Sequence, residues 1–162
     1  MALLYSSACG YAIRAVTRLA QEPTDRFCQL RDIAVSEGIP AAFLGKILQD
    51  LVRAGLLRSS KGPRGGYALA RRPGALTLLT IKEVIDGTAY LEGCASGLGR
   101  CSNDLPCPQH ERVKPLREAM RRYLAGTSVA DMARALSQKR ALLAAARSRR
   151  KRRPKRASPR AS

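Results

Sequence analysis

The residues best suited to chemistry lie in one short stretch, CASGLGRCSNDLPCPQH, at residues 94–110. It holds three of the five cysteines and the only histidine, in the spacing C-x6-C-x5-C-x2-H. These candidate ligands are Cys94, Cys101, Cys107 and His110. Thiolates and imidazoles are common ligands of zinc and of iron–sulfur clusters. Glycine, serine, asparagine and proline fill the gaps without hydrophobic periodicity, so the loop cannot bury itself and needs another source of order.

The spacing leaves three interpretations open. Structural zinc sites usually bring two ligands within about two to four residues of each other, and only Cys107 and His110 are that close here. Wider spacing on a glycine-rich loop favours a larger inorganic core that takes ligands from separate parts of the chain. An iron–sulfur cluster, a zinc ion and a loop without metal all remain compatible with these residues. Disulfides are disfavoured, because the cysteine count is odd and we expect a reducing compartment.

The remaining residues do not suggest catalysis. Cys9 and Cys28 lie in helical or pre-helical apolar sequence, which predicts small buried hydrophobic residues. A single histidine leaves little for acid–base chemistry, and we find no nucleophile with an adjacent base and no pair of catalytic acids. We therefore expect no enzyme and no small-molecule substrate.

Positive charge dominates this 162-residue chain and is concentrated toward one end. The formal net charge is +18, and twelve cations follow Asp131, the last acidic residue. A basic body with a more basic tail predicts a polyanion as partner, most often nucleic acid. We expect residues 138–162 to form a basic, disordered tail, although the preceding helix can run on through RALLAAA at 140–146. Plain solvation and attraction to phosphates are equally compatible interpretations of this tail.

The sequence also suggests a cellular location. No apolar run approaches the roughly 18 residues of a membrane span. The segment MALLYSSACGYAIR lacks the charged and long apolar regions of a signal peptide. We therefore expect a cytoplasmic protein without membrane contact.

Hydrophobic periodicity predicts a mainly α-helical domain with a small β-hairpin. Helices are expected at residues 8–20, 29–38 and 40–54. LLRSS (56–60) and YALA (67–70) are typical of strands, and the basic turn KGPRGG joins them. A helix-turn-helix followed directly by a basic hairpin indicates a winged helix-turn-helix domain, which we assign to residues 1–92. The third helix is expected to bury Phe43, Leu44, Ile47, Leu48, Leu51 and Val52.

Further segments follow this domain. TIKE, from Thr80 to Glu83, predicts a capping box at the start of another short helix. We expect residues 93–110 to form a cluster-binding loop. We expect residues 109–137 to form a long helix, in which Pro115 marks a bend or a later start, and a short helix. The apolar side of this helix can either fold back on its own domain or pair with a second copy of the chain. Because palindromic DNA needs two protein copies, we expect the long helix to be a dimerisation helix. Its apolar stripe consists of Val113, Leu116, Met120, Tyr123 and Leu124.

The winged helix indicates a double-stranded DNA operator as partner. Such a domain places its recognition helix in a major groove about 12 Å wide and reaches phosphates or a neighbouring groove with its wing. The candidate DNA contacts are Ala41, Ala42, Lys46 and Gln49 on the recognition helix and Lys61 and Arg64 on the wing.

The sequence as a whole resembles the iron–sulfur and nitric-oxide-sensing winged-helix repressors of the IscR/NsrR type. The matching text is YSSACGYAIRAVTRLA, then IPAAFLGKILQDLVRAGLLRSSKGPRGGYALARRP, and the C…C…CPQH loop. The resemblance implies a homodimeric repressor of the bacterial nucleoid with one cluster per subunit. By position, the three loop cysteines match the family's thiolate ligands, and His110 matches the imidazole ligand of its [2Fe–2S] branch.

Two further positions bear on the cluster type. In the [4Fe–4S] branch of that family, a carboxylate from the partner's first helix completes the site, whereas the matching position here is Gly10. The resemblance therefore favours [2Fe–2S] over [4Fe–4S]. The first cysteine gap is one residue longer than is common in the family, and Cys9 is an alternative fourth ligand.

These observations lead to one hypothesis and two rivals. The hypothesis is a transcriptional regulator whose DNA affinity depends on an iron–sulfur cluster that senses cluster status, redox stress or nitric oxide. The first rival is a zinc-stapled winged-helix DNA-binding protein without a sensing role. The second is a small iron–sulfur electron-transfer protein.

Overall fold

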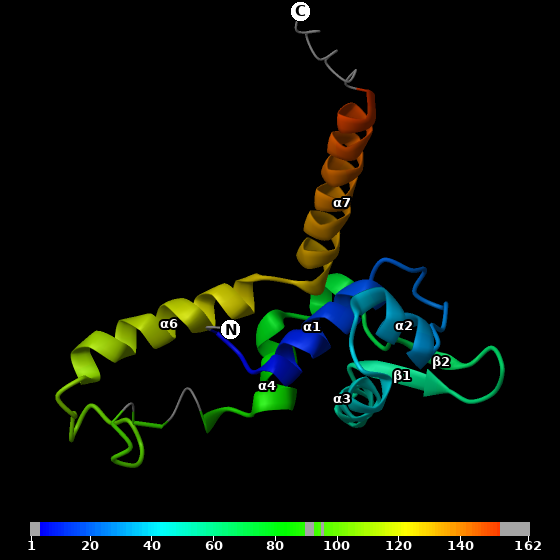
Figure 1. Cartoon of the computed structure of the whole chain (residues 1–162). Coiled ribbons are helices and arrows are strands. Elements are labelled where there is room, and N and C mark those ends of the chain that lie inside the picture. The colour runs from blue at the N-terminus through cyan, green and yellow to red at the C-terminus, as the bar shows by residue number, and fades with distance from the viewer. Residues whose placement is uncertain (1–3, 90–92, 95, 153–162) are drawn as a thin grey trace, which may run out of the picture.

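The computed structural model describes residues 4–89, 93–94 and 96–152, with residues 145–152 as backbone only. Figure 1 shows a body of short helices and one hairpin, from which two long helices project in different directions. Within these described ranges, no helix combines the length and apolar character that crossing a membrane requires.

Three helices form the helix-turn-helix part of the body, as the sequence predicted. Helix α1 spans Ser7–Leu19, and the Ser6 side chain caps it by accepting a hydrogen bond from the Cys9 N–H. Helix α2 spans Leu30–Glu37 and ends at Gly38 in the left-handed conformation. Helix α3 spans Ala41–Arg53 and begins directly after Pro40. A tight turn therefore joins α2 to α3, the recognition helix.

The wing is a two-stranded antiparallel sheet. Strand β1 (Leu57–Ser60) pairs with β2 (Gly66–Leu69), with Leu57 opposite Leu69. The backbone of Cys28 attaches β2 to the body, because its N–H donates to the Tyr67 carbonyl at 2.9 Å and its carbonyl accepts from the Tyr67 N–H at 2.8 Å. Gly66 permits this approach: its φ is 143°, and a Cβ there would lie far inside van der Waals distance of the Cys28 carbonyl oxygen.

The fourth helix starts one turn earlier than its sequence pattern suggested. After the 3-10 turn η1 (Pro73–Ala75), helix α4 spans Leu78–Asp86, and Thr77 caps it by accepting from the Thr80 N–H at 3.2 Å. The capping box expected at Thr80–Glu83 is therefore wrong. Leu78 decides the start, because its side chain is only 1% exposed and belongs to the core.

The core lies between α1, α3, α4 and the base of the hairpin. On α3, Leu44, Ile47, Leu48 and Leu51 are buried as expected. Phe43 was expected to be buried and is 44% exposed, because it lies one position outside the inward-facing spacing of these residues. Its ring packs edge-on against Tyr11, with 5.7 Å between centroids. The core includes Val16, Ile33, Leu44, Leu48, Leu51, Leu56, Leu76, Ile81, Leu124 and Val129.

The two projecting helices are α6 (His110–Gly126) and α7 (Val129–Arg152). Pro115 lies inside α6, so it does not delay the start of that helix. The short helix expected after Gly126 is instead long: it runs through RALLAAA, as the sequence allowed, and continues to Arg152, where disorder was expected. Residues 153–162 lie outside the described residues. Side-chain contacts between α7 and the body favour a continued helix. The charge pattern of the sequence gives no sign of these contacts.

Candidate DNA-binding face and metal centre

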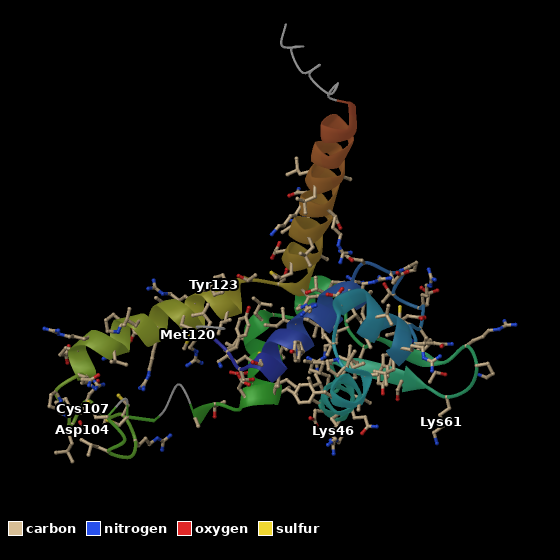
Figure 2. All side chains as sticks on the ribbon, in the orientation of Figure 1. Lys46, Lys61, Asp104, Cys107, Met120 and Tyr123 are labelled. Atoms are coloured by element: carbon tan, nitrogen blue, oxygen red, sulfur yellow. The ribbon has the colours of Figure 1, made fainter. Side chains whose placement is uncertain are left out.

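The predicted DNA contacts lie on one face formed by α3 and the wing. Lys46 and Lys61 point away from the body on the same side (Figure 2). The tip of the wing is held by Gln29, whose side-chain amide donates to the Pro63 carbonyl at 2.8 Å. Exposed cations on two elements of one face suit contact with a polyanion. The exposed residues of this face include Ala41, Ala42, Lys46 and Gln49 on α3 and Lys61 and Arg64 at the wing tip.

Phe43 is a surface residue of this region that the sequence reasoning missed. It lies in the first turn of α3, beside Ala41 and Ala42, and is 44% exposed. The first turn of the recognition helix therefore presents apolar side chains, while Lys46 and Gln49 follow one turn later. The helical period of 3.6 residues, counted from Leu44, excludes Phe43 from the buried side of α3 and so predicts that it is exposed.

Two of the four loop ligands are in direct contact. His110 Nδ1 lies 3.3 Å from Cys101 Sγ, and His110 Nε2 lies 3.0 Å from Asn103 Oδ1. Lys114, which can only donate, contacts the same Asn103 oxygen at 3.1 Å. The Asn103 atom is therefore an acceptor, so the ring proton belongs on Nε2. In the neutral imidazole the Nδ1 lone pair then faces Cys101, which is the tautomer that a metal ligand needs.

The other two cysteines are linked through Ser96. The Ser96 N–H donates to Cys94 Sγ at 3.4 Å, and the Ser96 hydroxyl donates to Cys107 Sγ at 3.8 Å. Hydrogen bonds from the backbone N–H groups of Ser96 and Leu98 outweigh burial and hold the pKa of the Cys94 thiol below its usual value. The sequence did not predict a positioning role for Ser96 or Asn103, because only residues able to bind metal directly were considered.

These two pairs share one hollow. Cys94, Cys101, Cys107 and His110 all line a cavity of about 320 Å³ at the far end of α6 from the body (Figure 2). His110 is only 5% exposed, whereas the three cysteines are half-buried. Among the described residues, no three His, Cys, Asp or Glu side chains lie close enough together to hold a single metal ion. One pair supplies a sulfur and a nitrogen, and the other supplies two sulfurs. Two separate pairs of donors in one cavity fit a dinuclear cluster better than one tetrahedral ion.

The two remaining cysteines lie elsewhere. Cys9 is fully buried in α1, and burial, with a smaller effect of Asp86, raises the pKa of its thiol to about 12. Cys9 does not line the loop cavity within this chain, so its role as an alternative fourth ligand stays a prediction. Burial also raises the pKa of Cys28, which is half-buried beside β2.

A helix-turn-helix, a basic wing on the same face and a long projecting helix define the class of winged-helix DNA-binding regulators. More specifically, the chain belongs to the Rrf2 family, described as iron-dependent transcriptional regulators, which it matches over residues 5–135.

Known relatives agree with this class. A protein of Aquifex aeolicus (strain VF5), described as an HTH-type transcriptional regulator, is 32% identical over 132 residues, which cover 80% of this chain and 91% of that protein. The regulator IscR of Vibrio cholerae is 26% identical over 122 residues, covering 75% of this chain and 70% of IscR.

Solved structures share the fold. CymR, the global cysteine regulator of Bacillus subtilis, superposes with a TM-score of 0.71 at 25% identity and covers 83% of this chain and 98% of CymR. T. potens IscR superposes with a TM-score of 0.67, also at 25% identity, and covers 84% of this chain and 90% of IscR.

Proposed function

We propose that this chain is a homodimeric, operator-binding transcriptional repressor whose DNA affinity is controlled by a [2Fe–2S] cluster. The observation that carries the proposal is the arrangement of the loop donors in two pairs on one hollow, Cys101 with His110 and Cys94 with Cys107. Each pair would serve one iron. When bound, such a cluster supplies a redox-active centre that oxidants, nitric oxide or iron shortage can damage or deplete.

The residues around the donors prepare them for this role. Asn103 fixes the His110 tautomer, so that the Nδ1 lone pair and the Cys101 sulfur face each other. Ser96 holds the other two sulfurs near each other by donating to both. These hydrogen bonds lower the ordering cost that a bound cluster must overcome.

Control of DNA binding would follow from the place of the loop in the chain. Residues 93–110 connect the winged-helix domain to α6, so the order of this loop affects how α6 lies relative to α3. In a dimer held together by α6, that relation sets the spacing of the two recognition helices. A tenfold change in operator occupancy requires a bias of about 1.4 kcal/mol between two dimer geometries, which ordering of a loop of this length can supply.

The surface of α6 supports the dimer. Leu116 is 69% exposed and Tyr123 is 49% exposed along a helix that projects from the body (Figure 1). A second α6 is the partner with matching apolar groups. Leu116→Glu should therefore lower the mass measured by sedimentation equilibrium from dimer to monomer. Leu142→Glu, at a 72% exposed position on α7, is the matched control and should leave the mass unchanged. An unchanged mass for Leu116→Glu would remove α6 from the interface.

The first test of the cluster is purification without oxygen. We expect a brown protein that contains iron and sulfide in equal amounts. Cys101→Ala should lose the visible absorbance while keeping its far-UV circular dichroism, and Cys28→Ala, at a cysteine outside the loop, should keep both. A colourless protein with stoichiometric zinc would favour the zinc-stapled alternative.

A second test probes the histidine. Because an imidazole ligand raises the potential of a [2Fe–2S] cluster relative to thiolate, His110→Cys should keep the cluster and lower its midpoint potential. His110→Ala should lose the cluster or hold it weakly. An unchanged potential in His110→Cys would exclude His110 as a ligand.

The DNA-binding face is tested with the wing. Lys61→Ala with Arg64→Ala should weaken binding to a duplex selected from a random pool. It should also reduce the slope of log affinity against log salt by about 1.8, or 0.9 for each lost phosphate contact. Arg71→Ala with Arg72→Ala removes two exposed cations just beyond β2 and serves as the control. Absence of any selected sequence would favour an electron-transfer protein over a regulator.

A further inference from the structure

Helix α7 extends away from the DNA-binding face. It has 24 residues, from Val129 to Arg152, and is therefore about 36 Å long at 1.5 Å per residue. Figure 1 shows that it rises from the body on the side opposite α3, and that neither α6 nor the wing runs beside its outer part. The basic residues of its outer end are therefore carried away from an operator bound to α3.

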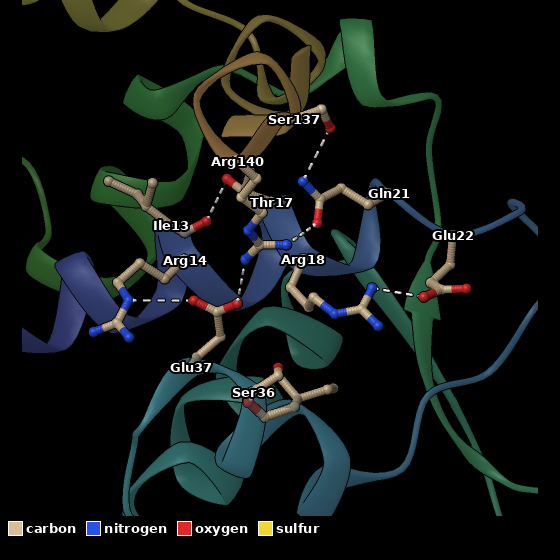
Figure 3. A network of polar contacts seen from close by, with 11 residues as sticks. Ile13, Arg14, Thr17, Arg18, Gln21, Glu22, Ser36, Glu37, Ser137 and Arg140 are labelled. Carbon is tan, nitrogen blue, oxygen red and sulfur yellow. Dashed lines mark hydrogen bonds and ion pairs between the residues drawn. The ribbon is translucent and has the colours of Figure 1, made fainter. Parts of the chain in front are cut away.

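The base of α7 is fastened to the body, so its direction is set by the fold (Figure 3). Arg140 donates to the Gln21 side chain at 3.0 Å and pairs with Glu37 at 3.6 Å. Gln21 also donates to the Ser137 hydroxyl at 3.4 Å. Glu37 is shared with Arg14 of α1, at 3.4 Å. These contacts join the first half of α7 directly to Gln21, just beyond α1, and to Glu37 of α2, and the outer half continues beyond them.

The charge of the outer half points to a polyanion. No acidic residue follows Asp131, and the segment RSRRKR at 147–152 continues into further cations beyond the described helix. Most of these cations are arginines, whose guanidinium groups bind phosphates in a bidentate manner. The run RRKR at 149–152 contains no apolar residue. A membrane-surface helix usually has aromatic residues beside its apolar face, and no aromatic residue occurs at 138–162.

We propose that the outer half of α7 is a second, sequence-independent binding element for double-stranded nucleic acid, and that it holds a different duplex from the one on α3 and the wing. This goes beyond operator recognition and does not require a cluster. The protein would thereby keep two DNA segments close together, one read by sequence and one held through its phosphates.

The test is a bridging assay with the full chain. A duplex carrying the selected sequence is immobilised, protein is added and washed, and a fluorescent duplex of random sequence is then offered. We expect capture of the second duplex. Arg150→Gln with Arg152→Gln should lose most of this capture, reduce its salt slope by about 1.8, and leave affinity for the immobilised duplex within twofold at moderate salt. The control, Arg71→Gln with Arg72→Gln, removes the same charge at two exposed positions just beyond β2 and should behave as wild type.

Three results would overturn the inference. The first is no capture by the wild type. The second is an equal loss of binding to both duplexes in Arg150→Gln with Arg152→Gln, which would mean that α7 contacts the operator itself. The third is stronger binding to vesicles of anionic phospholipid than to duplex DNA. Lys61→Ala with Arg64→Ala separates this inference from the proposed function. That variant should bind the selected sequence more weakly and still bind a random duplex through α7, as measured by fluorescence anisotropy.

Discussion

Replacing Gly66 by alanine is expected to detach the wing from the helical body. An added Cβ would lie far inside van der Waals distance of the Cys28 carbonyl oxygen, a backbone atom that can move only if the attachment opens. Opening it loses the two hydrogen bonds between Cys28 and Tyr67, worth about 1 kcal/mol each. A residue other than glycine at a φ of 143° costs about 1 to 3 kcal/mol more. Together these effects predict a loss of about 3 to 5 kcal/mol in the free energy of unfolding.

Two other glycines make matched controls for this substitution. Gly62 has a φ of 104° but open space around it, so Gly62→Ala measures backbone strain without a steric clash. Gly74 has neither a positive φ nor a steric clash, so Gly74→Ala should leave the free energy of unfolding nearly unchanged. Urea unfolding followed by circular dichroism gives the three free energies, and anisotropy gives the affinity for the selected duplex. If Gly66→Ala unfolds no more easily than Gly62→Ala, the contact with Cys28 does not hold the wing, and the reasoning is refuted.

Three further substitutions test the body. Burial raises the pKa of Asp86, but hydrogen bonds from Ser6 and Lys82 outweigh it and hold the pKa below its ordinary 3.8. The ionised carboxylate therefore stabilises the folded state fully above pH 3.8. That stabilisation is lost as the pH falls through the lowered pKa. Asp86→Asn should therefore cost about 2 to 4 kcal/mol near pH 7 and progressively less in acid, and a pH-independent cost in urea unfolding would contradict this. Gly45→Ala should raise the unfolding free energy by about 0.5 to 1 kcal/mol, because the new Cβ meets only a Leu30 methyl group, at 3.4 Å; destabilisation would show that α3 is overpacked there. Ser128→Ala should cost about 1 kcal/mol by removing the cap of α7, and no change in unfolding would assign the start of that helix to other contacts.

The helix-turn-helix and the wing were predictable because their signals are local. Ser6 caps α1, Gly38 ends α2, and the turn KGPRGG lies between two short strands, so each boundary can be identified without its neighbours. The start of α4 was not predictable in the same way. Thr77 and Thr80 are both acceptable caps, and only the burial of Leu78 decides between them.

The length of α7 and the pairing of the loop ligands depend on contacts distant in sequence. Charge alone suggests a solvated coil after residue 138, whereas the ion pair of Arg140 with Glu37 favours a continued helix. In the loop, residue types indicated which side chains can bind metal. The loop sequence has no periodicity, so the contact of His110 with Cys101 could not be predicted from it.

Pro115 gives α6 a property that a uniform helix lacks. Proline has no backbone N–H, so the bond that would normally run back to the Glu111 carbonyl is missing. The turn that begins with His110 is therefore joined to the rest of α6 by one hydrogen bond fewer than an ordinary turn. Bending there costs less than bending elsewhere along the helix, so the end that carries the imidazole can tilt while the length toward Leu124 keeps its packing against the core.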